Sequence, residues 1–308
     1  MEIKIKERII AHLWLMRPAN IMTAIADILA GFAASGSVIQ FMHVEEGWLN
    51  IPDLSSLGWL VLSTIGLYGG GIVFNDVFDA ELDKVERPER PIPSGKATKA
   101  SGSVLGGSLL LIGIVAAAQV SVLSAVIALV VATLAVAYDV FGKHQSWWGP
   151  LNMGLCRGGN LLLGVSAVPP AVAELWYLGL IPVIYIAAIT MISRGEVHGA
   201  NRQALQGGVL MYVIVIAAIV VLAVQEPSAI VWVLPFIILF ACLIFPPLFR
   251  ALKNKDPKFV GKAVKAGVLS LIVMDASIAA TFAGWQYGLL VLALLPISIF
   301  LAKSFAVT

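Results

Sequence analysis

Long apolar segments separated by short polar ones dominate this chain. Ten of them are long enough to cross a lipid bilayer, because about 20 apolar residues in an α-helix span its hydrocarbon core. They fall at 14–34, 57–77, 101–118, 120–138, 150–170, 176–193, 207–224, 229–249, 264–283 and 285–303. Each segment is continuously apolar rather than alternating, so helices must satisfy the backbone in lipid. The pattern predicts an all-α, polytopic transmembrane bundle of nine or ten helices, forming a single domain over residues 1–308.

Composition and charge support this interpretation. With 59% hydrophobic and 12% charged residues, the chain lies far outside the range of soluble domains. All lysines and arginines fall in alternate connecting segments or within the apolar segments on that side, and the opposite connections carry acidic residues but no lysine or arginine. The positive-inside rule therefore predicts a multi-pass protein of the cell (inner) membrane with a cytoplasmic N-terminus. The two cysteines, Cys156 and Cys242, lie in apolar surroundings, where packing is expected rather than a disulfide.

The end of the second apolar segment carries an amide and three carboxylates: Asn75, Asp76, Asp79 and Asp83. If the helix continues, steps of three and four residues place the carboxylates on one face. Three like charges at a membrane edge are destabilising unless a cation neutralises them. Oxygen ligands around a partly open position suit Mg²⁺, which shares its coordination with phosphate oxygens. The pattern therefore predicts a magnesium site.

Arginines follow this motif directly. Arg87 and Arg90 precede the turn at 91–95, and guanidinium groups are suitable partners for phosphate. Motif and arginines together predict a metal–diphosphate site. The alternative is an acidic helix end that water solvates at the membrane interface.

Polar residues also occur in a second loop and inside apolar segments. The loop after the sixth segment, 193–202, reads SRGEVHGANR. It stands four segments after the first motif, which suggests two similar halves that face each other. Arg157 lies within the fifth segment, where such a residue usually faces a cavity or a partner. The intramembrane acids Asp27 and Asp275 either reach a ligand in a cavity or are protonated and bond a neighbouring helix.

At this point the residues resemble the UbiA superfamily of intramembrane prenyltransferases. The family's Asn-Asp-x-x-Asp-x-x-x-Asp motif matches 75–83, and its Arg-Pro-x-Pro-Ser-Gly matches 90–95. The Arg-Pro and asparagine that open its first helix, and a tyrosine and lysine of its fourth, are similar to Arg17, Pro18, Asn20, Tyr138 and Lys143. The resemblance extends from about residue 12 to the end of the eighth segment.

The second motif departs from the family pattern. The family usually has two aspartates in a loop that ends in Gly-Asp-Arg, whereas this chain has Glu196, His198, Asn201 and Arg202. This version looks like the EboC-type branch, which is associated with gene clusters for secondary metabolites.

The resemblance implies a central cavity open to lipid and a Mg²⁺-dependent transfer of an isoprenyl group to a small, aromatic acceptor. The implied partners are an isoprenyl diphosphate, that acceptor and membrane lipid, with no nucleic acid. The expected metal ligands are Asn75, Asp76, Asp79, Asp83, Glu196 and Asn201. The four carboxylates among them are also the expected catalytic residues, although a motif aspartate or His198 remains open as the proton acceptor. The expected substrate-binding residues are Asn20, Arg87, Arg90, Tyr138, Lys143, Arg157 and Arg202, with Arg157 the one that would meet an acceptor carboxylate.

Two other interpretations remain. The first is a non-catalytic relative that binds a prenyl or aromatic precursor and assists its export, which the altered second motif favours. The second is another Mg²⁺-dependent membrane transferase, such as a phosphatidyltransferase. The Asp-Gly and Ala-Arg pairs of that family's motif are absent here.

Overall fold

The computed structural model describes residues 2–38, 54–142, 145, 147–193, 202–225, 229–254 and 256–305, and in these ranges the chain is helical apart from turns. In chain order the helices are α1 (Glu2–Met16), α2 (Pro18–Ala34), α4 (Ser55–Phe78), α5 (Ala80–Glu86), α6 (Lys99–Ala118), α7 (Val122–Val140), α8 (Trp148–Val165), α9 (Pro169–Leu175), the 3₁₀ turn η2 (Trp176–Gly179), α10 (Leu180–Ser193), α12 (Arg202–Gln225), α13 (Ala229–Asn254), α14 (Pro257–Leu292) and α15 (Leu294–Ser304).

Helices occupy all ten predicted segments, which confirms the all-α membrane fold. Among the described residues, seven helices are long and apolar enough to span a membrane, or eight with the bent pair α1–α2. This count is lower than nine or ten for two reasons. The polar residues of α8, including Arg157, lower its hydropathy, and Pro257–Lys303 counts as one stretch. A positive φ of 80° at Gly284 breaks that stretch where the last two segments were expected to separate.

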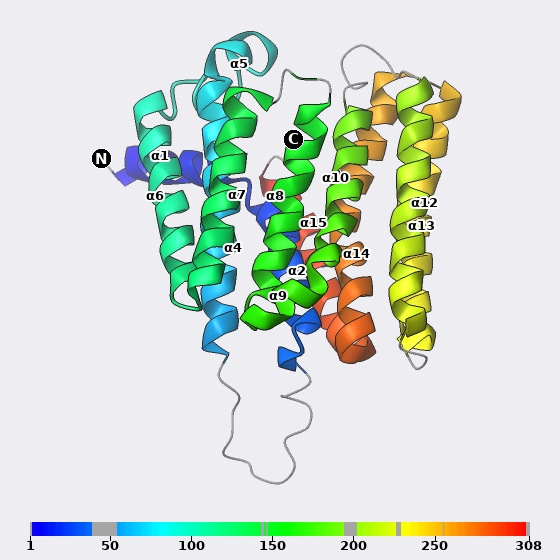
Figure 1. Cartoon of the computed structure of the whole chain (residues 1–308). Coiled ribbons are helices and arrows are strands. Elements are labelled where there is room, and N and C mark those ends of the chain that lie inside the picture. Colours follow the sequence, from blue (N-terminus) through cyan, green and yellow to red (C-terminus); the bar gives the residue numbers. More distant parts are fainter. Residues whose placement is uncertain are drawn as a thin grey trace.

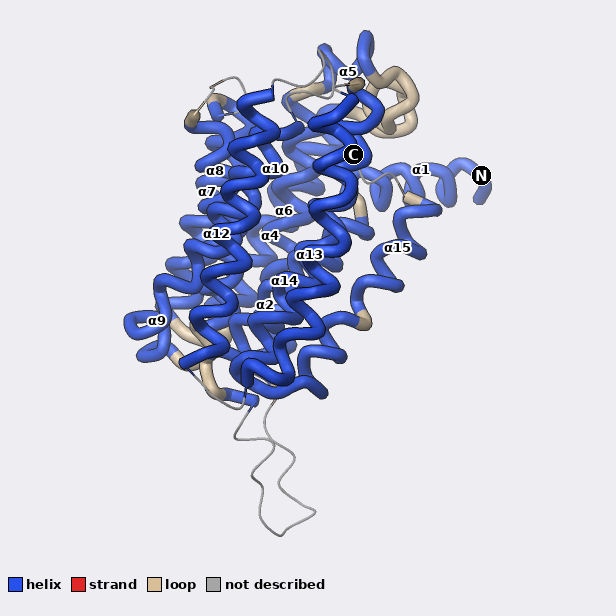
Figure 2. Tube along the Cα trace, turned by 90° about the vertical axis from the view of Figure 1, so that its right-hand side faces the viewer, coloured by secondary structure: helices blue, strands red, loops and turns tan. Residues whose placement is uncertain are grey.

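Figure 1 shows the helices side by side in one bundle, with α5 and the turn between α13 and α14 at one end and α9 at the other. The basic residues that follow α4 and those where α13 meets α14 therefore lie at the same end, as the charge pattern predicts. Figure 2 shows α15 at the edge of the bundle, on the side where α1 projects. The Ser298 hydroxyl of α15 donates a 2.9 Å hydrogen bond to the Ala19 carbonyl oxygen, which fastens it to α2.

Glycines allow α2 and α8, which build one wall of the site, to approach closely. A Cβ atom added to Gly31 would lie 2.1 Å from the Leu161 carbonyl oxygen, and one added to Gly164 would lie 2.5 Å from the Ile28 oxygen. Backbone therefore meets backbone at this crossing, as is typical where small residues line membrane helix interfaces.

A bend separates α1 from α2. The two segments Glu7–Met16 and Pro18–Ala34 meet at 43°. Pro18 disfavours helical geometry for the residue before it, and Arg17 adopts φ 46° and ψ 68°, a left-handed conformation that is uncommon outside glycine. The bend positions Arg17 at the entrance of the cavity described below.

Candidate functional site

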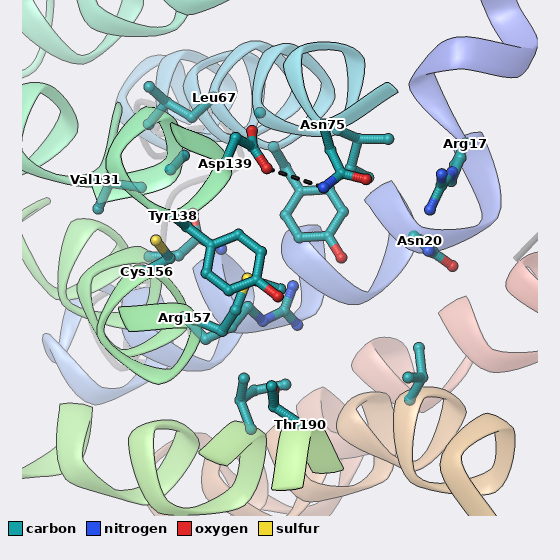
Figure 3. Close-up of a pocket in the computed structure, with 18 of the residues that line it drawn as sticks. Arg17, Asn20, Leu67, Asn75, Val131, Tyr138, Asp139, Cys156, Arg157 and Thr190 are labelled. Carbon is teal, nitrogen blue, oxygen red and sulfur yellow. Dashed lines mark hydrogen bonds between the residues drawn. The ribbon is translucent and has the colours of Figure 1, made fainter. Parts of the chain in front are cut away.

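A cavity of about 310 Å³ lies between α2, α4, α7, α8, α10 and α14. Most of its wall is apolar, from residues such as Leu67, Val131 and Ile189. Figure 3 shows its polar side chains, among them Arg17 and Asn75 on one side and Arg157 farther along. A mainly apolar chamber with polar groups at separate places suits a ligand with an apolar body and polar ends.

The motif aspartates lie where α4 gives way to α5. The helix is interrupted at Asp79 rather than continuous, but backbone hydrogen bonds persist on both sides, from Asp79 to Asn75 and from Asp83 to Asp79. As a result Asp76 and Asp83 still face the same way. Both accept hydrogen bonds from the same Arg90 nitrogen, Nη1, at 3.2 and 2.7 Å. The predicted common face therefore holds for these two carboxylates.

Arg17 completes this ion-pair network and is absent from our set of expected site residues. Its guanidinium donates a 2.7 Å hydrogen bond to Asp76, which is only 3% exposed. The one signal in the sequence is that Arg17 stands directly before Pro18, but the bend that aims it at Asp76 depends on the fold.

Asn75 turns toward α7 rather than toward the aspartates. Its side-chain nitrogen donates a 3.0 Å hydrogen bond to Asp139, which Figure 3 shows as a dashed line. Asp139 is 3% exposed and lines the cavity, as its neighbour Tyr138 does. The sequence placed Asp139 at the end of an apolar segment but gave no reason to assign it to the site.

The other expected residues fall into three groups: those that line the cavity, those that lie outside its wall, and those outside the described ranges. Asn20, Tyr138 and Arg157 line the cavity. Arg87 is half-buried directly after α5, and Arg202 is exposed at the start of α12, so neither belongs to the cavity wall. Four residues lie outside the described ranges: Lys143, Glu196, His198 and Asn201.

A second polar cluster lies deeper in the bundle, at the middle of the helices. Thr64 of α4 belongs to this cluster. It precedes Asn75 by eleven positions, so the two residues are about 16 Å apart along the helix. Arg157 of α8 pairs with Asp27 of α2, with Nε 3.0 Å from Oδ2, and Asn160 donates a 2.8 Å hydrogen bond to the same carboxylate. Thr64 in turn donates to Asn160 at 2.7 Å. The two intramembrane polar residues weighed from the sequence as separate features, Asp27 and Arg157, are therefore partners.

An exposed cluster fastens the motif loop to the neighbouring helix. Glu81 of α5 contacts both Lys84 and Lys99 at 2.7 Å, and Lys99 begins α6. Hydrogen bonds from Lys84 and Lys99 lower the pKa of Glu81 to about 2. Glu81 is thus a carboxylate of the same loop that pairs with lysines. It does not line the cavity.

The donor set of the motif fits Mg²⁺. Across the described ranges, no three His, Cys, Asp or Glu side chains form a group that could hold a metal ion by themselves. Asp76 and Asp83 nevertheless converge on one cationic nitrogen, which shows that a positive charge can bind between them. Mg²⁺ commonly uses one or two carboxylates and completes its shell with water and phosphate oxygens.

Comparison with known proteins agrees with this geometry. The sequence pattern of the UbiA prenyltransferase family matches residues 44–260. The digeranylgeranylglyceryl phosphate synthase of Saccharolobus solfataricus is 32% identical over 161 residues, which is 52% of this chain and 55% of that protein. The enzyme of that name from Methanothrix thermoacetophila is 31% identical over 51% of this chain and 54% of its own length. The chain thus matches about half the length of these curated relatives.

Solved structures share the fold. A structure of digeranylgeranylglyceryl phosphate synthase in membranes superposes with a TM-score of 0.63 at 20% identity, covering 92% of this chain and 99% of that one. A UbiA homologue from Archaeoglobus fulgidus bound to GPP and Mg²⁺ gives a TM-score of 0.62 at 12% identity, covering 87% and 99%.

Proposed function

Because this chain belongs to the UbiA prenyltransferase family, we propose that it transfers an isoprenyl group from an isoprenyl diphosphate to a small acceptor within the membrane, with Mg²⁺ as cofactor. One observation carries the proposal. Two carboxylates and two arginines form a single network beside the cavity lined by Arg17 and Asn75, and the rest of that cavity is largely apolar. An ionic head and an apolar tail are the two halves of an isoprenyl diphosphate.

The network gives each side chain a role in binding the diphosphate. Asp76 and Asp83 would hold Mg²⁺, which on binding supplies charge that stabilises the leaving diphosphate. Arg17 and Arg90, now paired with Asp76 at 2.7 and 3.2 Å, would turn to the phosphate oxygens. The same two positive charges therefore serve the aspartates in one state and the diphosphate in the other.

The apolar wall has a chemical role as well. Breaking the carbon–oxygen bond of an allylic diphosphate gives a carbocation that water would capture. Leu67, Val131 and Ile189 exclude water from the chamber, so the acceptor is the nucleophile that the cation meets. An aromatic acceptor then loses a proton. Among the described lining residues Asp139, which accepts a hydrogen bond from Asn75 of the motif, is the carboxylate that could take it.

The proposal also covers the chemical class of the acceptor and the orientation of the protein in the membrane. We favour an aromatic or other hydrophobic acceptor, although the matched relatives are named for a glyceryl phosphate product. The end of the bundle that carries α5 would face the cytoplasm of the cell membrane, because the basic connections gather there.

The non-catalytic role in export remains a second candidate, supported by one observation. Asp76 already has two arginine partners, so Mg²⁺ must compete for it. A protein that only binds an isoprenoid would have no need to release that carboxylate.

Titration calorimetry of the detergent-solubilised protein with a non-hydrolysable geranylgeranyl diphosphate analogue tests the proposal. Binding is expected with Mg²⁺ and not without it. It is expected to weaken at least about 100-fold in Asp76→Asn, since a charged ligand of the metal is lost. The matched control is Glu81→Gln, the same chemical change at an exposed carboxylate of the same loop, which should bind like wild type. Absence of Mg²⁺-dependent binding in wild type would move the assignment to the export role.

A further inference from the structure

The deep polar cluster lies in the wall of the cavity and is not needed for diphosphate binding. Arg157 and Asn160 both line the chamber. Asn160 contacts Thr64, about 16 Å along α4 from Asn75, and Arg157 lies against Tyr68, about 10 Å along α4 from Asn75. Buried polar groups are costly in a membrane and usually bind something there. The hydrogen bonds within the cluster show which atoms remain available.

The side-chain polar atoms of Asp27, Asn160 and Thr64 all have hydrogen-bond partners, and so does Nη2 of Arg157. Arg157 donates from Nη2 to the Thr23 carbonyl oxygen at 2.9 Å and to Asp27 at 3.2 Å. Asn160 donates to the Ala24 carbonyl oxygen and to Asp27, and accepts from Thr64. These bonds hold Arg157 in one orientation, as does the Tyr68 ring, whose centroid lies 5.3 Å from the guanidinium.

Two guanidinium nitrogens of Arg157, Nε and Nη1, have no hydrogen-bond partner within the described part of the chain, although the residue is only 4% exposed. Nε lies 3.0 Å from Oδ2 of Asp27 in the ion pair, so Nη1 is the nitrogen left without a described polar partner. Arginine has five N–H donors and cannot lose its proton in proteins, so the unsatisfied N–H groups represent a free-energy cost. A ligand oxygen in the cavity would remove that cost.

The charge of the cluster decides what kind of oxygen fits. Asp27 already neutralises Arg157 through a 3.0 Å ion pair. Asp275 of α14 is fully buried, and its two oxygens accept no hydrogen bond from any residue that the structure describes. The positive charge of Arg157 is therefore already matched by a carboxylate before any ligand binds.

We propose that the inner part of the cavity binds an uncharged oxygen of the acceptor, a hydroxyl or a carbonyl, through Nη1 of Arg157. A carboxylate would add a negative charge to a cluster whose positive charge is already matched. This corrects our expectation from the sequence, in which Arg157 would meet a carboxylate as an unpaired base. The inference deepens the proposed prenyl transfer and rests on it. It assigns a substrate class to the acceptor end of the chamber.

Two naphthalene probes that carry different groups at the same ring position test the idea: neutral 2-naphthol with a hydroxyl and anionic 2-naphthoate with a carboxylate. Their dissociation constants are measured by naphthalene fluorescence on wild-type protein, saturated with the diphosphate analogue and Mg²⁺. We expect 2-naphthol to bind at least about 10-fold more tightly, because burying an uncompensated charge costs more than an additional contact provides. Equal or tighter binding of the naphthoate would overturn the proposal without involving any variant.

A variant locates the contact. In Arg157→Lys a single ammonium group can pair with Asp27 but cannot also place a fixed donor at the position of Nη1. We expect this variant to bind 2-naphthol about 10-fold or more weakly than wild type does. The matched control Arg250→Lys changes an exposed arginine of α13 and should leave both probes unchanged. Unchanged 2-naphthol affinity in Arg157→Lys would contradict the assignment.

Binding of the diphosphate analogue distinguishes failure of the acceptor assignment from failure of the proposed function. If the analogue binds with Mg²⁺ and the naphthalene probes behave otherwise than expected, only the acceptor assignment fails. If the analogue does not bind wild type at all, prenyl transfer fails first.

Discussion

Arg17 and Asp76 form a 2.7 Å ion pair although 59 positions separate them in the chain. The contact depends on the bend at Pro18, which holds Arg17 in a left-handed conformation at the entrance of the cavity. A strained residue at a site is typical of functional positions, where surrounding contacts maintain the strain. The pair therefore connects the N-terminal bend to the predicted metal ligands.

The first prediction concerns this pair. In Arg17→Gln, Asp76 keeps only its 3.2 Å contact to Arg90, so we expect a loss of about 1–3 kcal/mol of stability without Mg²⁺. Mg²⁺ should then raise the thermal midpoint by more than it does in wild type, because the cation no longer competes with Arg17. Thermal unfolding in detergent, with and without Mg²⁺, measures both effects.

The control for that experiment is Lys84→Gln. It removes one cation from an exposed pair of the same loop, where water screens the attraction, so its stability and its response to Mg²⁺ should match wild type. An equal response to Mg²⁺ in Arg17→Gln and wild type would contradict the idea that arginine and metal compete for Asp76.

The second prediction concerns the buried pair of Asp27 and Arg157. Asp27→Leu leaves the guanidinium without its carboxylate in the middle of the membrane, and we expect a loss of about 3–5 kcal/mol. The double variant Asp27→Leu/Arg157→Met removes both charges and should recover most of that loss. Reversible unfolding in mixed micelles measures the three free energies. Additive losses in the double variant would show that the two residues are not coupled.

The third prediction concerns the crossing of α2 and α8. The new methyl group of Gly31→Ala would lie 2.1 Å from a backbone oxygen, so the helices must separate, at a cost of about 1–3 kcal/mol. Gly107→Ala is the matched control, because this glycine of α6 has no atom within 4 Å of its added Cβ. Alanine there should be neutral or stabilising by up to about 1 kcal/mol, owing to its higher helix propensity. Thermal midpoints of both variants test the contrast, and equal midpoints would argue against backbone contact at the crossing.

The fourth prediction concerns the pH dependence of the motif loop. Because the pKa of Glu81 falls from 4.5 to about 2, its pairs with Lys84 and Lys99 are present above pH 4.5 and are lost as the pH falls toward 2. NMR titration of the labelled Glu81 carboxyl should place its midpoint near 2. In Lys99→Gln the midpoint should move up toward 4.5, since one of the two lysine hydrogen bonds is gone. An unchanged midpoint in that variant would exclude the contact to α6.

The sequence predicted the helices well because their signal is local. Continuous apolar runs located the long helices of the bundle, although not α5 or most of α1, and Gly284 divides the last long stretch where the pattern indicated. The motif spacing also placed Asp76 and Asp83 on one face, which their common contact to Arg90 reproduces. These features depend on neighbours within a few turns of the same helix.

Contacts between residues far apart in the chain could not be predicted from the sequence. Arg157 and Asp27 were each identifiable as costly residues in a membrane, but nothing in the local pattern pairs positions 130 apart. The role of Asp139 was missed for the same reason, since its partner Asn75 belongs to another helix. The assigned roles of the second loop, at 194–201, remain predictions, because that loop lies outside the described residues.

The polar character of α8 also bears on how the protein enters the membrane during synthesis. Arg157 and Asn160 make α8 a poor candidate for release into lipid by itself, because a central arginine costs several kcal/mol in translocon-mediated insertion. Its partner Asp27 lies on α2, which leaves the ribosome about 130 residues earlier. We therefore expect stable integration of α8 to depend on its contact with α2, which must still be within reach when α8 arrives.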